Sequence, residues 1–213
     1  MKIALFGATG HIGQGILDEA LTRGYDVVAV VRDPSRLPQK NAKLTVVTGD
    51  VAKPESWTDA VRGADAVVAS LSARRDGNPE LVPSNARVLL ENLPKASVPR
   101  LFWVGGAGTL EVAPGKRVID DPHFPAAWKP EAEAQGKALD VFRANHGGVT
   151  WTYLSPAALI EPGERTGKYR VGGEQLLVDA EGNSRISIAD YAVGLLDRVE
   201  KRDAENKRVT LAY

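Results

Sequence analysis

The sequence has 213 residues, with 27 lysines and arginines against 27 aspartates and glutamates, so its formal net charge is zero. Hydrophobic residues make up 43% and charged residues 25%, which is typical of an ordinary globular domain. The lack of cysteine excludes disulfides and thiolate catalysis, and the neutral balance argues against a nucleic acid or anionic membrane held by bulk charge.

Short β-branched runs alternate with helical patterns along the chain. The runs are almost continuously apolar, as in strands buried on both faces of a parallel sheet. The expected strands cover residues 2–6, 26–31, 44–48, 66–70, 100–104 and 149–154. The expected helices cover residues 11–23, 54–62, 84–93 (with Ser84 as N-cap), 130–145 and 189–201. This alternation predicts an α/β fold, a Rossmann-type doubly wound parallel sheet with helices on both faces and a small irregular C-terminal substrate region.

Two long segments, 105–128 and 162–183, are rich in glycine and lack a clear period, apart from short strand-like pieces at 168–171 and 175–179. Each follows a strand at its C-terminal end, where open α/β sheets bind ligands. Long irregular segments in a compact domain are often functional. We therefore expect substrate-side loops here, within a single domain spanning residues 1–213.

Targeting and metal signals are lacking in the sequence. The three histidines, His11, His123 and His146, show no metal-ligand spacing, so no metal site is predicted. The chain starts directly with a strand pattern, and no apolar run approaches the roughly 20 residues that cross a bilayer. We expect a cytoplasmic protein that binds a small molecule and neither nucleic acid nor membrane.

A glycine-rich turn joins the first expected strand to the first expected helix. It consists of Gly7, Ala8, Thr9, Gly10, His11, Ile12 and Gly13. In such a turn the first glycine permits the tight bend, the second lets a pyrophosphate approach the backbone, and the third lets the helix pack on the sheet. The helix N-terminus supplies free N–H groups. A turn that binds nothing is the alternative, but the strand–turn–helix context favours a dinucleotide.

The end of the second expected strand bears on the choice of cofactor. Arg32 occupies the strand tip, whereas Asp33 and the proline after it have the character of a turn. A guanidinium at this place can pair with the 2′-phosphate of NADP(H), and Arg36 could add a second charge. A solvated arginine is the alternative. Arg32 therefore favours NADP(H) as the cofactor, with NAD(H) as the alternative.

The Gly-Ala-Thr-Gly-x-Ile-Gly turn resembles the extended and atypical short-chain dehydrogenase/reductase families. Further motifs resemble a bacterial group of atypical members named NADH-flavin reductases or NAD(P)-binding oxidoreductases, related to NmrA-like proteins and to flavin and biliverdin reductases. These motifs are Val-Gly-Gly-Ala-Gly at 104–108, Asp-Pro-x-Phe-Pro at 121–125, Trp-Thr-Tyr-Leu-Ser-Pro-Ala at 151–157 and Gly-Glu-Arg-Thr-Gly at 163–167. The resemblance covers essentially the whole chain and implies a nicotinamide cofactor.

The resemblance also implies further cofactor contacts at the ends of the other strands. Asp50 and Val51 would lie near the adenine, although an aspartate that starts a turn is equally expected there. The other positions, beside the cofactor or its nicotinamide, are Ser70, Leu71, Ser72, Gly105, Ser155 and Pro156.

The catalytic residues are not evident. The wider superfamily uses Tyr-x-x-x-Lys after the fifth strand, but here Lys137 would pair with Glu133 in the place of the tyrosine. A carboxylate is a poor proton donor at neutral pH, so an exposed i,i+4 ion pair between the two is preferred. The remaining weak candidates are Thr109, His123 and Ser155, with Lys137 itself as the fourth.

Three functions remain in competition. The first is an NADPH-dependent oxidoreductase that transfers a hydride to a flat conjugated acceptor such as a flavin or quinone, for which a dedicated proton donor is less necessary. The second is an inactive NADP(H)-binding redox sensor, and the third, weaker option is an enzyme like a nucleotide-sugar epimerase. A homodimer is one option for the assembly.

Overall fold

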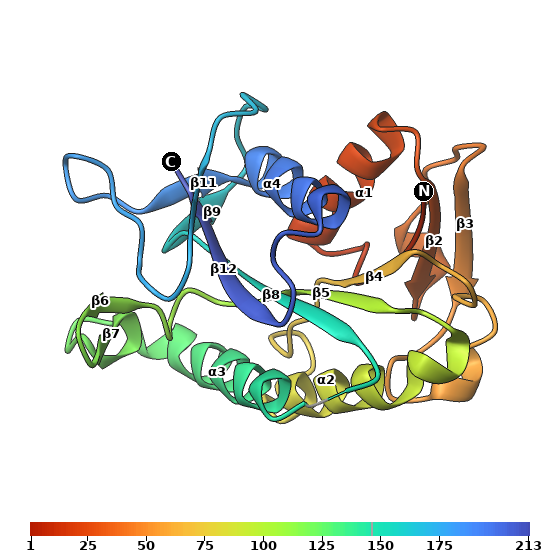
Figure 1. The fold of residues 1–213 in the computed structure, drawn as a ribbon, viewed down its shortest axis with the longest axis horizontal. Helices are drawn as coiled ribbons and strands as arrows, with labels where there is room; N and C mark the ends of the chain where they lie inside the picture. Colours follow the sequence, from red (N-terminus) through yellow and green to blue (C-terminus); the bar gives the residue numbers. More distant parts are fainter. Residues whose placement is uncertain (146) are drawn as a thin grey trace.

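An eight-stranded sheet forms the centre of the protein (Figure 1). The computed structural model describes residues 1–145 and 147–213, so His146 lies outside the described residues. In spatial order the sheet runs β10 (Arg170–Gly172), β12 (Lys207–Ala212), β8 (Thr150–Pro156), β5 (Arg100–Val104), β4 (Ala66–Ala69), β1 (Lys2–Phe6), β2 (Asp26–Val31) and β3 (Leu44–Thr48). Neighbouring strands pair in parallel except β10 and β12. The predicted doubly wound α/β fold is confirmed.

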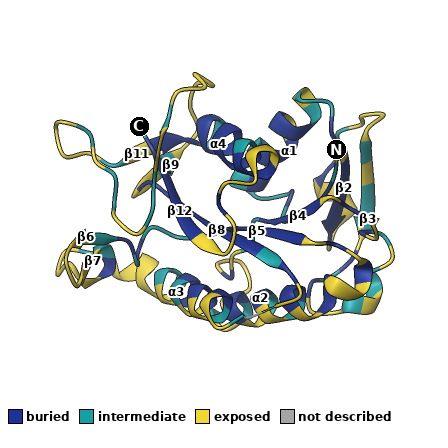
Figure 2. Cartoon of the chain, viewed as in Figure 1, coloured by how far each residue is buried: buried dark blue, intermediate teal, exposed yellow. Residues whose placement is uncertain are grey.

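Two layers of helices cover the sheet (Figure 1). One face carries α1 (His11–Thr22) and α4 (Ile188–Lys201), and the other carries α2 (Leu81–Asn92) and α3 (Lys129–Arg143). Successive strand residues point to opposite faces. Accordingly Leu5 packs in the core beside α1 and α4, whereas Phe6 packs in the core beside α2 and α3. Burial on both faces explains the continuously apolar strand sequences (Figure 2).

Short elements decorate the C-terminal half and the loops. They are strands β6 (Glu111–Ala113), β7 (Lys116–Arg117), β9 (Leu159–Glu161) and β11 (Arg185–Ser187), and 3₁₀ turns at Pro34–Arg36, Pro54–Ser56, Pro94–Ala96, Val118–Asp120 and Ala126–Trp128. The two irregular segments touch each other, because the Glu111 amide donates to the Glu174 carbonyl and the Leu176 amide donates to the Glu111 carbonyl. Together they border the sheet beyond the ends of β5 and β8 (Figure 1).

Some sequence expectations about the elements were wrong. The expected helix over 54–62 is a 3₁₀ turn followed by further turns, because Trp57 is buried edge-on against Phe6 and donates its indole N–H to the Val51 carbonyl. Helix α2 begins at Leu81 with Glu80 as N-cap, so Ser84 lies inside it. Its Pro83 is tolerated because first-turn N–H groups have no partner within the helix.

The strand predictions near the C-terminus were also incomplete. The sequence did not predict β12, and residues 175–179 form only an isolated bridge between Gln175 and Glu111. The piece at 168–171 appears one to two residues later, as β10.

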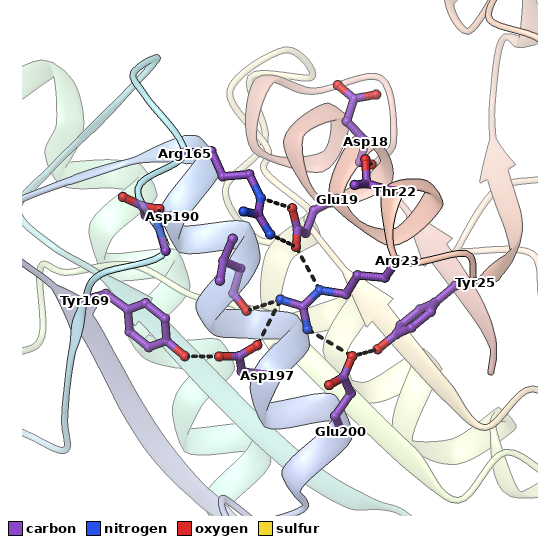
Figure 3. A network of polar contacts seen from close by, with 12 residues as sticks. Asp18, Glu19, Thr22, Arg23, Tyr25, Arg165, Tyr169, Asp190, Asp197 and Glu200 are labelled. Carbon is purple, nitrogen blue, oxygen red and sulfur yellow. Dashed lines mark hydrogen bonds and ion pairs between the residues drawn. The ribbon is translucent and has the colours of Figure 1, made fainter.

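A network of charged residues joins α1 to α4 and to the segment after β9 (Figure 3). The buried Glu19 accepts hydrogen bonds from Arg23 at 2.8 Å and from Arg165 at 2.6 Å. Arg23 also pairs with Asp197 and Glu200 on α4. Nearby, Thr166 and the Gly167 amide donate to the buried Asp190. These contacts hold the first part of the 162–183 segment on the helices.

Replacing Glu19 by glutamine is expected to destabilise the protein by about 1–3 kcal/mol, because the site loses the carboxylate charge and one of the two oxygens that accept hydrogen bonds from Arg23 and Arg165. Burial raises the pKa of Glu19, but the hydrogen bonds from Arg165 and Arg23 outweigh it and leave the pKa below its usual value. The stabilisation is therefore full above the unfolded pKa of about 4.3 and is lost as the pH falls through the lower native pKa.

Urea unfolding of wild type and Glu19→Gln at neutral and acid pH checks this. The wild type should lose its advantage on acidification, whereas Glu91→Gln, an exposed change on α2, should behave as wild type at both pH values. Equal stability of wild type and Glu19→Gln at neutral pH would contradict the expectation.

Candidate functional site

The glycine turn lies where the order of the strands reverses. Strand β1 pairs with β2 on one side and with β4 on the other. The chain adds β2 and β3 on the first side of β1 and then crosses over to add β4 and β5 on the second side. In open α/β sheets this is where ligands bind, outside the carboxyl ends of the strands.

The three glycines of the turn are needed for different reasons. Gly7 has φ +83°, and a Cβ there would lie 2.0 Å from the Ser70 carbonyl oxygen. A Cβ on Gly13 would lie 2.0 Å from the Gly7 carbonyl oxygen. At Gly10 the nearest protein atom to such a Cβ is 3.5 Å away, which is ordinary contact. Packing explains Gly7 and Gly13, but no atom of the described residues would crowd a Cβ at Gly10.

The N-terminus of α1 opens at the same turn. Gly10 is its N-cap, and a glycine has no side-chain oxygen with which to cap the helix. Thr9 is half-buried and His11 is exposed, so the turn reaches the surface. The free N–H groups and the partial positive charge of the helix end can therefore hold an anion such as a pyrophosphate.

Arg32 follows directly after β2, as expected from the sequence. The neighbouring Asp33 caps a 3₁₀ turn, and its carboxylate accepts from both the amide and the hydroxyl of Ser35. Asp33 is thus engaged in the turn, and Arg32 is the residue presented at the strand tip. Its guanidinium pairs with Asp76 at 2.8 Å, and this contact raises the pKa of Arg32. Arg36 is exposed at the end of the same 3₁₀ turn.

The ends of β3 and β4 bring the next group of predicted residues to this edge. Asp50 follows β3 and accepts from the Ala52 amide at 3.0 Å, the contact expected of an aspartate that starts a turn, and Val51 is buried. Ser70 follows β4 and lies against Gly7. After it, the Leu71 carbonyl accepts from Gln135 and the Ser72 hydroxyl accepts from the Arg74 amide.

The loop after β5 rests on a buried polar cluster. Gly105 lies against the ring of Tyr153, and a Cβ there would be 2.0 Å from a ring carbon, so packing explains this glycine. The Ser155 hydroxyl donates to the Gly106 carbonyl at 2.9 Å and accepts from Arg208 at 2.8 Å. Ser155 and Pro156 are both buried at the end of β8. Burial raises the pKa of Tyr153 to about 12, so its phenol stays protonated.

Of the four catalytic candidates, Thr109 and Ser155 meet at Arg208, whereas His123 and Lys137 engage other partners. The Ser155 hydroxyl is hydrogen-bonded within the buried cluster. The Thr109 carbonyl accepts a hydrogen bond from Arg208, and the Thr109 methyl group faces Gly136. His123 is 95% exposed, and its amide and ring both hydrogen-bond to Asp121. Lys137 is exposed and pairs with Glu80 instead of forming the expected i,i+4 pair with Glu133, which is exposed too.

The inward face of α3 carries residues that the sequence interpretation missed. Gln135 accepts from the Trp103 indole at 3.0 Å and donates to the Leu71 carbonyl, and Glu131 accepts from the Ala73 amide and from Gln135. They repeat the four-residue spacing of the superfamily Tyr and Lys, two positions before the pair considered from the sequence. Their contacts join α3, β5 and the loop after β4.

Residues 1–145 and 147–213, the described part of the chain, contain neither a candidate metal site nor a membrane-spanning helix. No cluster of three or more His, Asp or Glu side chains there could hold a metal ion. No helix in that part of the chain is long and apolar enough to cross a membrane.

Comparison with known proteins assigns this site to a family. The model of a family described as NAD(P)H-binding matches residues 7–198. A protein structure from Burkholderia pseudomallei, provisionally named an exported protein, is 41% identical with a TM-score of 0.90 and full coverage of both chains. One from Bacteroides thetaiotaomicron, provisionally named an epimerase, is 37% identical with a TM-score of 0.91, covering 100% of this chain and 96% of that one.

A third structure bears the name expected from the sequence motifs. It comes from Streptococcus pneumoniae, is provisionally named an NADH-flavin reductase, and is 34% identical with a TM-score of 0.88, covering 100% of this chain and 99% of that one. The predicted Rossmann-type fold and the resemblance to atypical short-chain dehydrogenase/reductases are confirmed. The three names differ in the reaction, and one of them refers to an exported protein. The reaction, the cytoplasmic location and the homodimer therefore stay predictions.

Proposed function

We propose, from the premise that the chain belongs to the NAD(P)H-binding family, that it is an NADPH-dependent oxidoreductase with a flat conjugated acceptor such as a flavin or quinone. The observation that carries the proposal is Gly10. It lies at an open helix N-terminus, where an added Cβ would meet no protein atom closer than 3.5 Å, so the turn leaves room there for a pyrophosphate.

The residues present fit a nicotinamide dinucleotide. The turn from Gly7 to Gly13 would hold the pyrophosphate on backbone N–H groups, and Arg32 would hold the 2′-phosphate. The adenine would lie by Asp50 and Val51, and the nicotinamide beside Ser70–Ser72 and the loop that starts at Gly105. When bound, the reduced cofactor supplies the hydride.

The protein's own part in such a reaction is orientation rather than proton transfer. Ser155 and Thr109 share the buried Arg208 as a hydrogen-bond donor, and His123 and Lys137 are exposed and paired with other carboxylates. A flavin or quinone suits a site of this kind, because water can protonate the reduced ring once the hydride has been transferred. The segments 105–128 and 162–183 are proposed to border the acceptor.

A second candidate function is a redox sensor that binds NADP(H) without turnover. The scatter of the catalytic candidates favours it as well, and such a regulator would act through a protein partner. The epimerase option has less support, because Glu133 and Lys137 both lie on the exposed side of α3.

The experiment that tests the proposal follows NADPH absorbance with FMN, riboflavin and quinones, beside NADH. We expect oxidation with at least one acceptor and a preference for NADPH. Arg32→Ala should weaken NADPH by about tenfold or more, since a charge-assisted hydrogen bond contributes about 1.5–3 kcal/mol, and should leave NADH unchanged.

Arg62→Ala is the matched control, since Arg62 is also a half-exposed arginine in an ion pair. It lies near the start of β4, at the amino-terminal ends of the strands and away from the glycine turn. Tight NADPH binding without turnover on any acceptor would contradict the proposed reductase function and favour the redox sensor.

A further inference from the structure

The ion pair between Arg32 and Asp76 links two segments that are far apart in sequence. Asp76 lies in the loop between β4 and α2, 44 residues after Arg32. Both carboxylate oxygens are engaged, with Nη1 to Oδ1 at 2.8 Å and Nη2 to Oδ2 at 3.3 Å. The carboxylate thus uses the forked pair of N–H groups, which is also the geometry that a phosphate would use.

The pair spans the glycine turn from one side to the other. Arg32 continues from β2 and Asp76 belongs to the loop that continues from β4, and these two strands flank β1. The turn from Gly7 to Gly13 leaves β1 between them. A dinucleotide on that turn with its adenosine toward β2 would therefore bring its ribose to the place where Arg32 and Asp76 meet.

We propose that Asp76 lowers the preference for NADPH over NADH by competing with the 2′-phosphate of NADPH for the guanidinium of Arg32. This inference rests on the proposed function. The two ligands compete, because Asp76 holds the pair of N–H groups from Nη1 and Nη2, so the phosphate must either take over that pair or bind beside a carboxylate whose negative charge repels it. NADH has no 2′-phosphate and leaves the ion pair in place.

The exposure of the pair sets the size of the effect. The Arg32 side chain is 58% exposed and that of Asp76 is 29% exposed. Exposed ion pairs change an equilibrium by about fivefold at most, which corresponds to about 1 kcal/mol. A phosphate can therefore displace Asp76, and the competition lowers NADPH affinity without abolishing it. It narrows the preference for NADPH over NADH.

The test measures dissociation constants of NADPH, NADH and adenosine 2′,5′-bisphosphate for wild type and Asp76→Asn at low ionic strength. We expect Asp76→Asn to bind NADPH and the bisphosphate about two- to fivefold more tightly, with NADH unchanged. Asp59→Asn is the matched control, because it removes the same charge from another exposed ion pair, with Arg62. It should change none of the three constants.

A double variant tests the route of the effect. In the Arg32→Ala background, the gain of Asp76→Asn for NADPH should shrink, because the contested guanidinium is gone and only the removal of a negative charge remains. The inference is overturned if wild type binds NADPH while Asp76→Asn leaves its affinity unchanged or weaker, or if the gain is equally large without Arg32. Failure of wild type to bind either nucleotide would instead refute the proposed function itself.

Discussion

Replacing Gly10 by alanine is expected to abolish tight NADPH binding while leaving the fold as stable as before. Gly10 has φ −87° and ψ 163°, which alanine adopts without strain, and the added Cβ meets no protein atom closer than 3.5 Å. Such changes usually stabilise a protein by about 0.4–1 kcal/mol through the unfolded state, and the poorer N-capping by alanine at this position offsets that gain. The methyl group would occupy the approach of the pyrophosphate. Loss of two charge-assisted hydrogen bonds amounts to about a hundredfold in affinity.

Gly13→Ala provides the contrast, because its Cβ would be 2.0 Å from the Gly7 carbonyl oxygen and something must shift. We expect it to lose stability as well as binding. Gly173→Ala is the control, since its Cβ would have nothing within 4 Å and the residue lies outside the turn. Thermal unfolding and NADPH titration of the three variants separate the outcomes. A Gly10→Ala protein that binds NADPH like wild type would show that the turn does not hold the phosphates.

Replacing Arg208 by methionine is expected to destabilise the protein by about 3 kcal/mol and to impair turnover. The Arg208 side chain is 1% exposed, and it donates to the Ser155 hydroxyl and to the carbonyls of Thr109 and Gly106. Methionine fills much of the same space but leaves these acceptors without their donor, and each buried loss costs about 1–3 kcal/mol. For a chain of this size the midpoint of thermal unfolding should fall by roughly 6–12 °C.

Turnover should fall because the loop after β5, the proposed nicotinamide side of the site, loses the hydrogen bonds that Arg208 donates to its carbonyls. Arg143→Met is the matched control, since Arg143 contacts the same Glu174 but is 49% exposed. Surface changes of that kind usually stay within about 0.5 kcal/mol. An Arg208→Met protein as stable as the Arg143→Met control would contradict this account of the buried cluster.

The sequence predicted those parts of the molecule whose information is local. The apolar runs gave the bounds of β1, β2, β3 and β5 correctly, and the glycine spacing located the turn. The same approach misassigned the segment around Trp57, where packing against Phe6 overrides the helical pattern. It also missed β12, although the strand pairs with β8 along most of its length.

The sequence likewise predicted only the local features of the candidate site. The positions of the turn and of Arg32 follow from residues that are adjacent in sequence. The partners that fix their surroundings are distant: Asp76 is 44 residues from Arg32, and Arg208 is 102 residues from Gly106. No local pattern encodes such contacts. The inward face of α3 does carry a local signal, because Glu131 and Gln135 keep the same four-residue spacing as Glu133 and Lys137.

A crystal structure of the chain with NADPH tests the central claim most directly. The account predicts the pyrophosphate on the amides between Gly7 and Gly13 at the N-terminus of α1. It also predicts the 2′-phosphate on Arg32, with Asp76 displaced. A dinucleotide bound elsewhere on the protein, or no bound dinucleotide at saturating NADPH, would contradict it.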